Sequence, residues 1–194
     1  STNPLSHTPS LEKIAQRFTV YAPFLFDLDF ADVESLAKSL AEFMQELVRL
    51  SWSSQGPILA QEFLARHGIA VVIEPHLPRT RLDAAVFLLD SDRPVIGLTL
   101  RHDRIDNFWF CVMHELAHLS LHLNTSDEDF YDDLDVESLD DVRETEADSL
   151  AGEALIPQSV WEKSPARHLR SIDAVHHLAR QLKIHPAIVA GRIR

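Results

Sequence analysis

Glycine, cysteine and long apolar runs are all scarce in this chain of 194 residues. Its 5 glycines form no phosphate-cradling loop, which excludes the nucleotide-binding proteins that depend on one. The single cysteine, Cys111, rules out an intramolecular disulfide and fits a reducing compartment, and we expect it to be a small core residue. No segment approaches about 18 unbroken apolar residues, so we expect no membrane span. Residues 1–10 lack the basic start and the apolar stretch of a signal peptide.

The acidic residues are unevenly distributed. The chain has a net charge of −12, and residues 127–148 hold twelve acids and one base, so this segment alone carries −11. Such a run is usually a solvated loop, which is the interpretation we favour. The alternative is an acidic wall beside a cleft, which would favour metal capture or basic substrates. We expect no direct contact of this chain with nucleic acid.

Hydrophobic periodicity predicts an α+β fold, with a tail and helical extension at 1–55 and the main domain at 56–194. We expect a small antiparallel sheet, because a hairpin-length turn joins two of its strands, and we expect the last strand to form one wall of a cleft. The expected elements are helices at 11–50, 58–67, 105–123 and 142–156, a linker at 51–57, strands at 69–74, 84–89 and 95–100, and two short helices within 171–194.

The segment His-Glu-Leu-Ala-His at 114–118 lies inside the run 105–123, which is apolar on nearly every side and therefore predicts a buried helix. Buried ionisable groups normally have a partner or bind a metal, because an unpaired buried charge is costly. His114 and His118 are four residues apart, so they share one helix face and can converge on one cation. Glu115 is turned about 100° from His114, where it can still reach a water on the metal. This is the zincin arrangement of two ligands and a general base, and it predicts a zinc site.

A third protein ligand has to come from outside this turn. His122 lies eight residues after His114, about 12 Å along the axis, which is too far for one ion, so we interpret it as a packing or outer residue. The helix predicted at 142–156 opens with several acids, and Glu144 and Asp148 share one face. We predict Glu144 as the third ligand, with Glu146 as the alternative, although acids also suit the positive end of a helix. Asp148 could then accept the ring N–H of a ligand histidine.

Two further sets of residues are left open by the pattern. The group that stabilises the oxyanion could be His102, Arg104 or Tyr131, which are close to the motif in sequence only. The two short helices around 183–186 have the outline of a helix-turn-helix, but a pair packed on the core explains them equally well, and we favour packing. The histidines of this region have no ligand spacing and are interpreted as surface residues: His176, His177 and His185.

From about residue 58 onward the chain resembles the ImmA/IrrE family of zinc-dependent metallopeptidases. The resemblance rests on the stretches His-Gly-Ile at 67–69, RIDNFWF at 104–110, HELAHLSLH at 114–122 and ETEADSLAGEALIP at 144–157. The last is similar to the family's E-x-x-A-[D/N] signature. Carried over residue by residue, the resemblance implies histidine ligands at His114 and His118, the catalytic base at Glu115 and the acidic ligand at Glu144.

The resemblance also implies a gluzincin-like site in a cytoplasmic bacterial or phage protein that cleaves, or is coupled to, a helix-turn-helix repressor. Residues 1–55 show no repressor-type DNA-binding domain, so that module belongs to a partner or to a part of the protein outside this sequence. Some relatives act in toxin–antitoxin systems. We therefore expect a zinc metallo-endopeptidase acting on a repressor or antitoxin, and the alternative is a zinc-containing regulatory or antitoxin-type binding protein without catalysis. The presence of Glu115, which is not a ligand, favours the enzyme.

Overall fold

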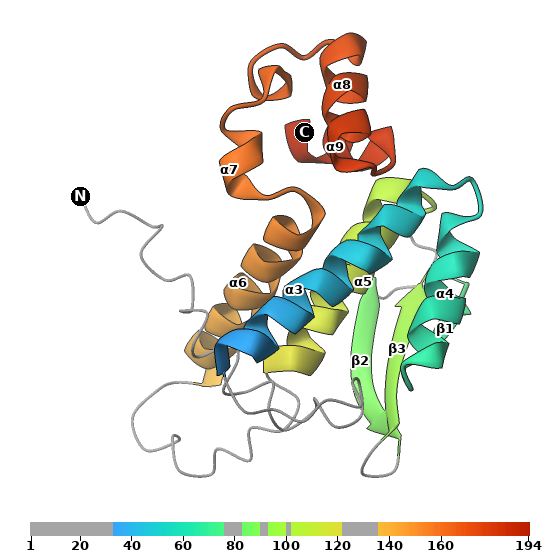
Figure 1. Ribbon diagram of the computed structural model, residues 1–194. Coiled ribbons are helices and arrows are strands. Elements are labelled where there is room, and N and C mark those ends of the chain that lie inside the picture. Colours follow the sequence, from blue (N-terminus) through green and yellow to red (C-terminus); the bar gives the residue numbers. More distant parts are fainter. Residues whose placement is uncertain (1–32, 76–82, 90–92, 100–101, 122–135) are drawn as a thin grey trace.

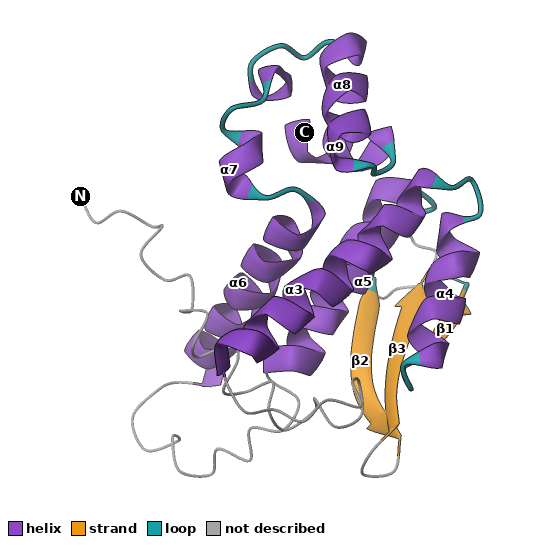
Figure 2. Cartoon of the chain, in the orientation of Figure 1, coloured by secondary structure: helices purple, strands orange, loops and turns teal. Residues whose placement is uncertain are grey.

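The computed structural model describes residues 33–75, 83–89, 93–99, 102–121 and 136–194. The described chain is mostly helical, with a small sheet along one side (Figure 2). Helix α5 (Ile105–Leu121) lies between the sheet and helix α6 (Val136–Leu155), and helix α3 (Val33–Arg49) packs against α6 (Figure 1). The α+β fold expected from the sequence is therefore confirmed. In the described part of the chain, no helix has the length and apolar character that crossing a bilayer requires.

The sheet has three strands in the order β1-β3-β2. Strand β2 (Ala84–Leu89) is antiparallel to the central β3 (Arg93–Thr99), whereas β1 (Ala70–Glu74) runs parallel to β3. The prediction of an antiparallel sheet was thus right for β2 and β3 and wrong for β1. A short turn forces the strands on either side of it into an antiparallel pair, but it says nothing about a third strand. Because β3 pairs with both neighbours, β1 and β2 are left at the two edges.

The segment 51–57 is not the linker that the sequence suggested. It contains the 3₁₀ turn η1 (Leu50–Trp52) and the start of helix α4 (Gly56–Arg66). Helix α4 ends at Arg66 with His67 as its cap, and Gly68 follows with a φ of 79°, which is strained for residues with a side chain. The amide of Gly68 donates to the carbonyl of Ala65 (3.1 Å) and the amide of Ile69 to that of Leu64 (3.0 Å), which is the Schellman pattern. This turn directs the chain into β1.

Helix α5 is the centre of the core. Trp109 and Val112 are completely buried, and Leu116 and Leu119 nearly so, because the helix touches the sheet, α6 and α9. The buried side chains of α3 belong to the same core: Leu40, Phe43, Met44, Leu47 and Val48. The division of the chain at residue 55 stays a prediction.

Helix α6 begins at Val136 and not near 142, so residues 136–141 of the acidic run are helical and not part of the loop that we favoured. These residues hold only two apolar side chains, Val136 and Leu139, among acids and a serine, which is why the pattern missed them. Acidic side chains are nevertheless compatible with the first turns of a helix, because its N-terminal end carries a partial positive charge. The rest of the acidic run, up to 135, lies outside the described residues.

The chain ends in short helical elements. Helix α7 (Gln158–Trp161) and the 3₁₀ turn η3 (Pro165–Arg167) lead into α8 (Ile172–Leu182) and α9 (Pro186–Ile193). Helix α9 holds the place that a DNA-reading helix would have in a helix-turn-helix, yet it packs on α5. Its side chains Ile188 and Val189 are buried. The packing role that we favoured for this pair is therefore confirmed.

Candidate metal centre

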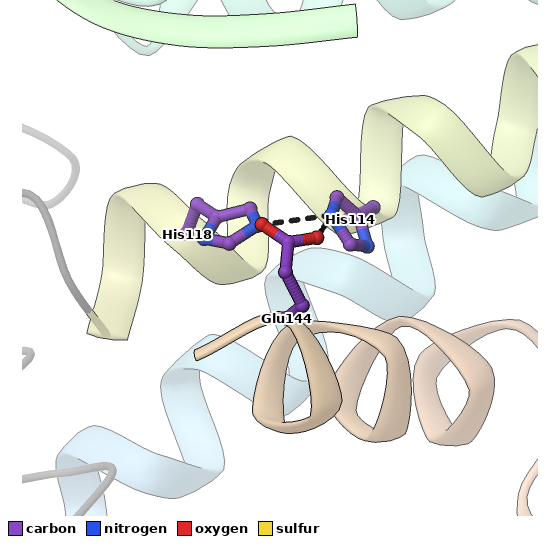
Figure 3. A group of neighbouring side chains, drawn as sticks. All are labelled: His114, His118 and Glu144. Carbon is purple, nitrogen blue, oxygen red and sulfur yellow. Dashed lines mark hydrogen bonds and ion pairs between the residues drawn. The ribbon is translucent and has the colours of Figure 1, made fainter. Parts of the chain in front are cut away.

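Helices α5 and α6 bring three potential metal ligands together. His114 and His118 lie one turn apart on the same face of α5, and Glu144 reaches toward them from α6 (Figure 3). Each offers one ligand atom, and these atoms lie within 4.8 Å of one another. Among the residues that the structure describes, this is the one group of three or more histidine, cysteine or acidic side chains that could hold an ion. The third member, Glu144, comes 26 residues after His118 and lies on another helix, so tertiary packing assembles the group.

The spacing of the three side chains matches the ligand shell of zinc. The Nε2 atoms of His114 and His118 are 2.9 Å apart, and each lies 3.2 Å from a carboxylate oxygen of Glu144. In a tetrahedral site with bonds of about 2.0–2.1 Å, ligand atoms are separated by about 3.3–3.4 Å. The observed separations differ from this value by only a few tenths of an ångström. The donor set of two imidazoles and one carboxylate is also typical of catalytic zinc.

The histidines and the carboxylate differ in exposure. The His114 and His118 side chains are 15% and 16% exposed, whereas that of Glu144 is 61% exposed. Burial, followed by the nearby His114, lowers the pKa of His118, against the opposing effect of Glu144 and Asp148. A lowered pKa keeps the imidazole neutral at neutral pH, which is the form that binds metals. Because Glu144 is the exposed member, the group is open to solvent on its α6 side. A substrate could approach from this side.

Asp148 lies one turn beyond Glu144 on α6. Its Oδ1 atom is 2.9 Å from Nδ1 of His114, while Nε2 of the same ring points to Glu144. The angle at the ring nitrogen does not meet hydrogen-bond geometry, although the two atoms are at hydrogen-bond distance. A carboxylate this close to Nδ1 nevertheless favours the tautomer with its N–H on Nδ1, which leaves Nε2 as the acceptor. Glu146, the alternative third ligand, is not part of the metal-binding group. It lies about 200° around α6 from Glu144, since each residue turns a helix by about 100°.

Glu115 is a buried carboxylate beside the group, with 6% of its surface exposed. Burial raises the pKa of Glu115 to about 7, and the negative charge of Glu144 acts in the same direction. The backbone N–H of Val86 on β2 donates a hydrogen bond to it and partly offsets these effects on the pKa. The backbone group beside Glu115 thus comes from the edge strand β2, and not from the last strand, which we had expected to form the wall. The alternating pattern of the strands could not show this, because it does not say which strand is at the edge.

The other polar residues that are close to the motif in sequence do not belong to the metal-binding group. Arg104 forms an ion pair with Asp106 at the start of α5, about 15 Å along the axis from His114 by helical rise. His102 is exposed just before the helix, and Cys111 is buried as expected, with burial raising the pKa of its thiol to about 12. Two residues named from the sequence, Tyr131 and His122, fall outside the described residues.

Residues 64–194 match the family described as the IrrE N-terminal-like domain, a peptidase family, and this match covers more than half of the chain. The chain belongs to this family. The ImmA/IrrE resemblance drawn from its motifs is therefore confirmed.

Among curated proteins no match is found. A solved structure of a transcriptional regulator from Mycobacterium tuberculosis is similar, with 20% sequence identity and a TM-score of 0.43. The similarity covers 94% of this chain and 51% of that structure, so the chain spans about half its length.

Proposed function

We propose that this protein is a zinc-dependent endopeptidase of the cytoplasm that cleaves a helix-turn-helix repressor or an antitoxin. The observation that supports it most is the convergence of three zinc-type ligand atoms within 4.8 Å beside a buried carboxylate. Membership of a peptidase family supports the same reaction class. The choice of a repressor or antitoxin as substrate follows from the family resemblance.

His114, His118 and Glu144 would hold the zinc ion, because their separations and donor types fit it. When bound, zinc lowers the pKa of a coordinated water to about 7 and polarises the carbonyl of the bond to be cleaved. Asp148 would keep His114 in the tautomer that presents Nε2 to the ion. These four side chains come from two helices that pack against each other, and this packing would fix their relative positions.

Glu115 would act as the general base and then as the general acid. Its carboxylate takes the proton of the attacking water and delivers it to the amine that leaves. A general base works best when its pKa is close to the working pH, and burial has moved the pKa of Glu115 to about 7. Its position one residue after His114 turns it away from the ligand shell, so it is available for proton transfer.

A second function is supported by the hydrogen bond between Glu115 and β2. Because the Val86 amide donates to this carboxylate, Glu115 could be present only to hold the edge strand on α5. The zinc group would then stabilise a regulatory or antitoxin-type binding protein without catalysis.

Glu115→Gln separates the two functions. Glutamine keeps the size of the side chain and an acceptor oxygen for Val86, but it cannot take a proton at neutral pH. For a peptidase we expect normal zinc content and thermal stability, with cleavage of a repressor encoded beside the gene reduced by at least ~100-fold. The measurement is the rate at which the intact repressor disappears, with Glu146→Gln as a control of equal charge change. Unchanged cleavage by Glu115→Gln would rule out the base, and the absence of cleavage by the wild type would favour the binding protein.

A further inference from the structure

A pocket of about 290 Å³ lies between α5, α6 and α9, toward the end of α5 that is opposite His118. Its apolar walls are Phe110 from α5, Leu155 and Ile156 from α6, and Ile188 from α9. Small-molecule and cofactor sites usually have volumes of about 300–1,000 Å³, so this pocket is at the lower limit for a whole ligand. Its size suits a single large side chain.

The pocket lies along the same two helices as the metal-binding group. Residues 110, 114 and 118 share one face of α5, and 144, 148 and 152 share one face of α6. The Phe110 ring, which lines the pocket, has its centroid 5.8 Å from that of His114, and it is 38% exposed. One helical turn, about 6 Å, therefore separates the pocket from the nearest ligand. An extended peptide advances about 3.3 Å per residue, so the near edge of the pocket, at Phe110, lies within about two residues of a bond held at the metal. From there the pocket extends away from the metal-binding group, toward Arg104.

Gly152 keeps this end of the helix pair open. It lies in the interior of α6, where glycine is unfavourable for the helix, and it lines the pocket. A Cβ atom built on Gly152 meets no other heavy atom within 4 Å, so close packing does not require glycine here. Its φ is not in the left-handed region either, because among the described glycines only Gly68 has a positive φ. What the missing side chain does provide is open space beside the pocket.

The charged groups of the pocket are held by other partners. Arg192 donates from Nη1 to the carbonyls of Gly152 (3.1 Å) and Ile156 (2.5 Å), and its guanidinium lies 5.2 Å from the centroid of the Trp161 ring. Arg104 is paired with Asp106. Among the residues that line the pocket, two arginines stand against one aspartate, and that aspartate is already paired, so the lining offers no free acid to a lysine or arginine side chain.

We propose that this pocket selects substrates by receiving a large apolar side chain, of leucine, methionine or phenylalanine size, within two residues of the bond that is cleaved. Gly152 is the specificity-determining residue, because any side chain at this position would occupy the entry. The assignment rests on the proposed function, since it needs a peptide held at the zinc ion. It adds a role for the C-terminal helical pair, because α9 forms one wall of the pocket.

The test measures the binding of small hydroxamates to the zinc-loaded wild-type chain by calorimetry. Acetohydroxamate reports on the metal alone, and succinyl hydroxamates that carry an isobutyl, a benzyl or an aminobutyl group add one side chain each. We expect the isobutyl and benzyl compounds to bind at least ~10-fold more tightly than acetohydroxamate, as expected for burial of one large apolar side chain. The aminobutyl compound should show no such gain.

Gly152→Leu should remove the gain while zinc content and acetohydroxamate affinity stay unchanged, and Gly152→Ala should reduce it in part. Ser149→Leu is the matched control, because it adds the same bulk at an exposed position of α6 that does not line the pocket. The pocket assignment alone would be overturned if the wild type bound all four compounds with equal affinity. It would also be overturned if folded Gly152→Ala and Gly152→Leu kept the full gain in affinity for the isobutyl and benzyl compounds. Failure of acetohydroxamate to bind the zinc-loaded wild type would overturn the metal centre as well.

Discussion

The two ends of the contact between α5 and α6 are built from the same pair of helices but have opposite characters. One end carries His114, His118, Glu144 and Asp148, whose nitrogen and oxygen atoms face one another at 2.9–3.2 Å. The other end is lined by apolar side chains and is closed by α9. Under the proposed function, the identity of each atom matters at the first end, because an ion and a proton would have to be held there. At the second end, the proposed selection depends on shape, on the absence of a side chain at residue 152 and on the charged groups of the lining.

This difference shows how a helix pair can separate reaction from selection. His114 and His118 are held by burial and by partners, which under the proposed function would set their positions before a substrate arrives. The apolar end can change its size through residue 152 without disturbing any of those contacts. Variants that act on one end and leave the other unchanged are therefore the means of testing the division.

The largest effect is expected from removing the acidic ligand. Glu144→Gln keeps the shape of the side chain but removes the charge that complements the ion, so the purified protein should lose most of its zinc. Glu146→Gln, on the same helix but outside the group, should retain one zinc ion per chain. Metal content by atomic emission measures both. Retention in Glu144→Gln together with loss in Glu146→Gln would transfer the ligand role to Glu146.

A smaller effect at the same end is expected from Asp148→Asn. The amide can still contact His114 but is a weaker acceptor for the ring N–H, so zinc affinity should fall by roughly 10–100-fold without being abolished. Competition with a chromogenic chelator measures the change. If the affinity is unchanged, Asp148 is only an exposed acid on the helix face.

The pocket end can be altered through two glycines that should respond in opposite directions. A Cβ at Gly191 of α9 would lie 2.8 Å from Oδ2 and 3.0 Å from Cβ of Asp106, so Gly191→Ala should push α9 from α5. We expect a net loss of about 1 kcal/mol in the free energy of unfolding, since the overpacking exceeds the gain in helix propensity. Gly152→Ala meets no atom within 4 Å and should stabilise the protein by about 0.5–1 kcal/mol.

Urea unfolding of the zinc-free protein measures both alanine variants, and both should bind zinc as the wild type does. Stabilisation by both substitutions would show that the close contact at Gly191 is relieved without cost, and destabilisation by both would contradict the open space at Gly152.

The smallest effect is a change of stability with pH, and it concerns the pocket end alone. The hydrogen bond from Arg104 lowers the pKa of Asp106, against the opposing effect of burial. Because the pKa is lower in the folded state, this carboxylate stabilises the fold above the unfolded value of about 3.9, and the contribution is lost as pH falls through the folded pKa. Asp106→Asn should therefore be less stable than wild type at pH 5, with a smaller difference at pH 3. Urea midpoints of zinc-free protein measure this, with the exposed Asp103→Asn as control, and a difference independent of pH would contradict it.

The prediction from sequence succeeded where local patterns decide the structure. Strand β2 begins and ends at the predicted residues, and α5, α8 and α9 agree closely, because their apolar spacing and end signals are local. It failed where partners are distant: the parallel pairing of β1, the place of β2 at the sheet edge, and the early start of α6 all depend on contacts with other elements. The position of Val86 beside Glu115 could not be predicted for the same reason.

The sequence by itself determined the chemistry of the candidate centre, because two histidines four residues apart on a helix must share a face and a glutamate between them must turn away. It also limited the third ligand to the acids of the next long helix, since a side chain further along α5 is too far away. Only the tertiary structure decided that Glu144 and Asp148 face the two histidines, because the rotation and height of α6 against α5 are set by packing of the whole core. The same packing placed α9 over the start of α5 and so formed the pocket beside Gly152, which no short segment of the chain contains.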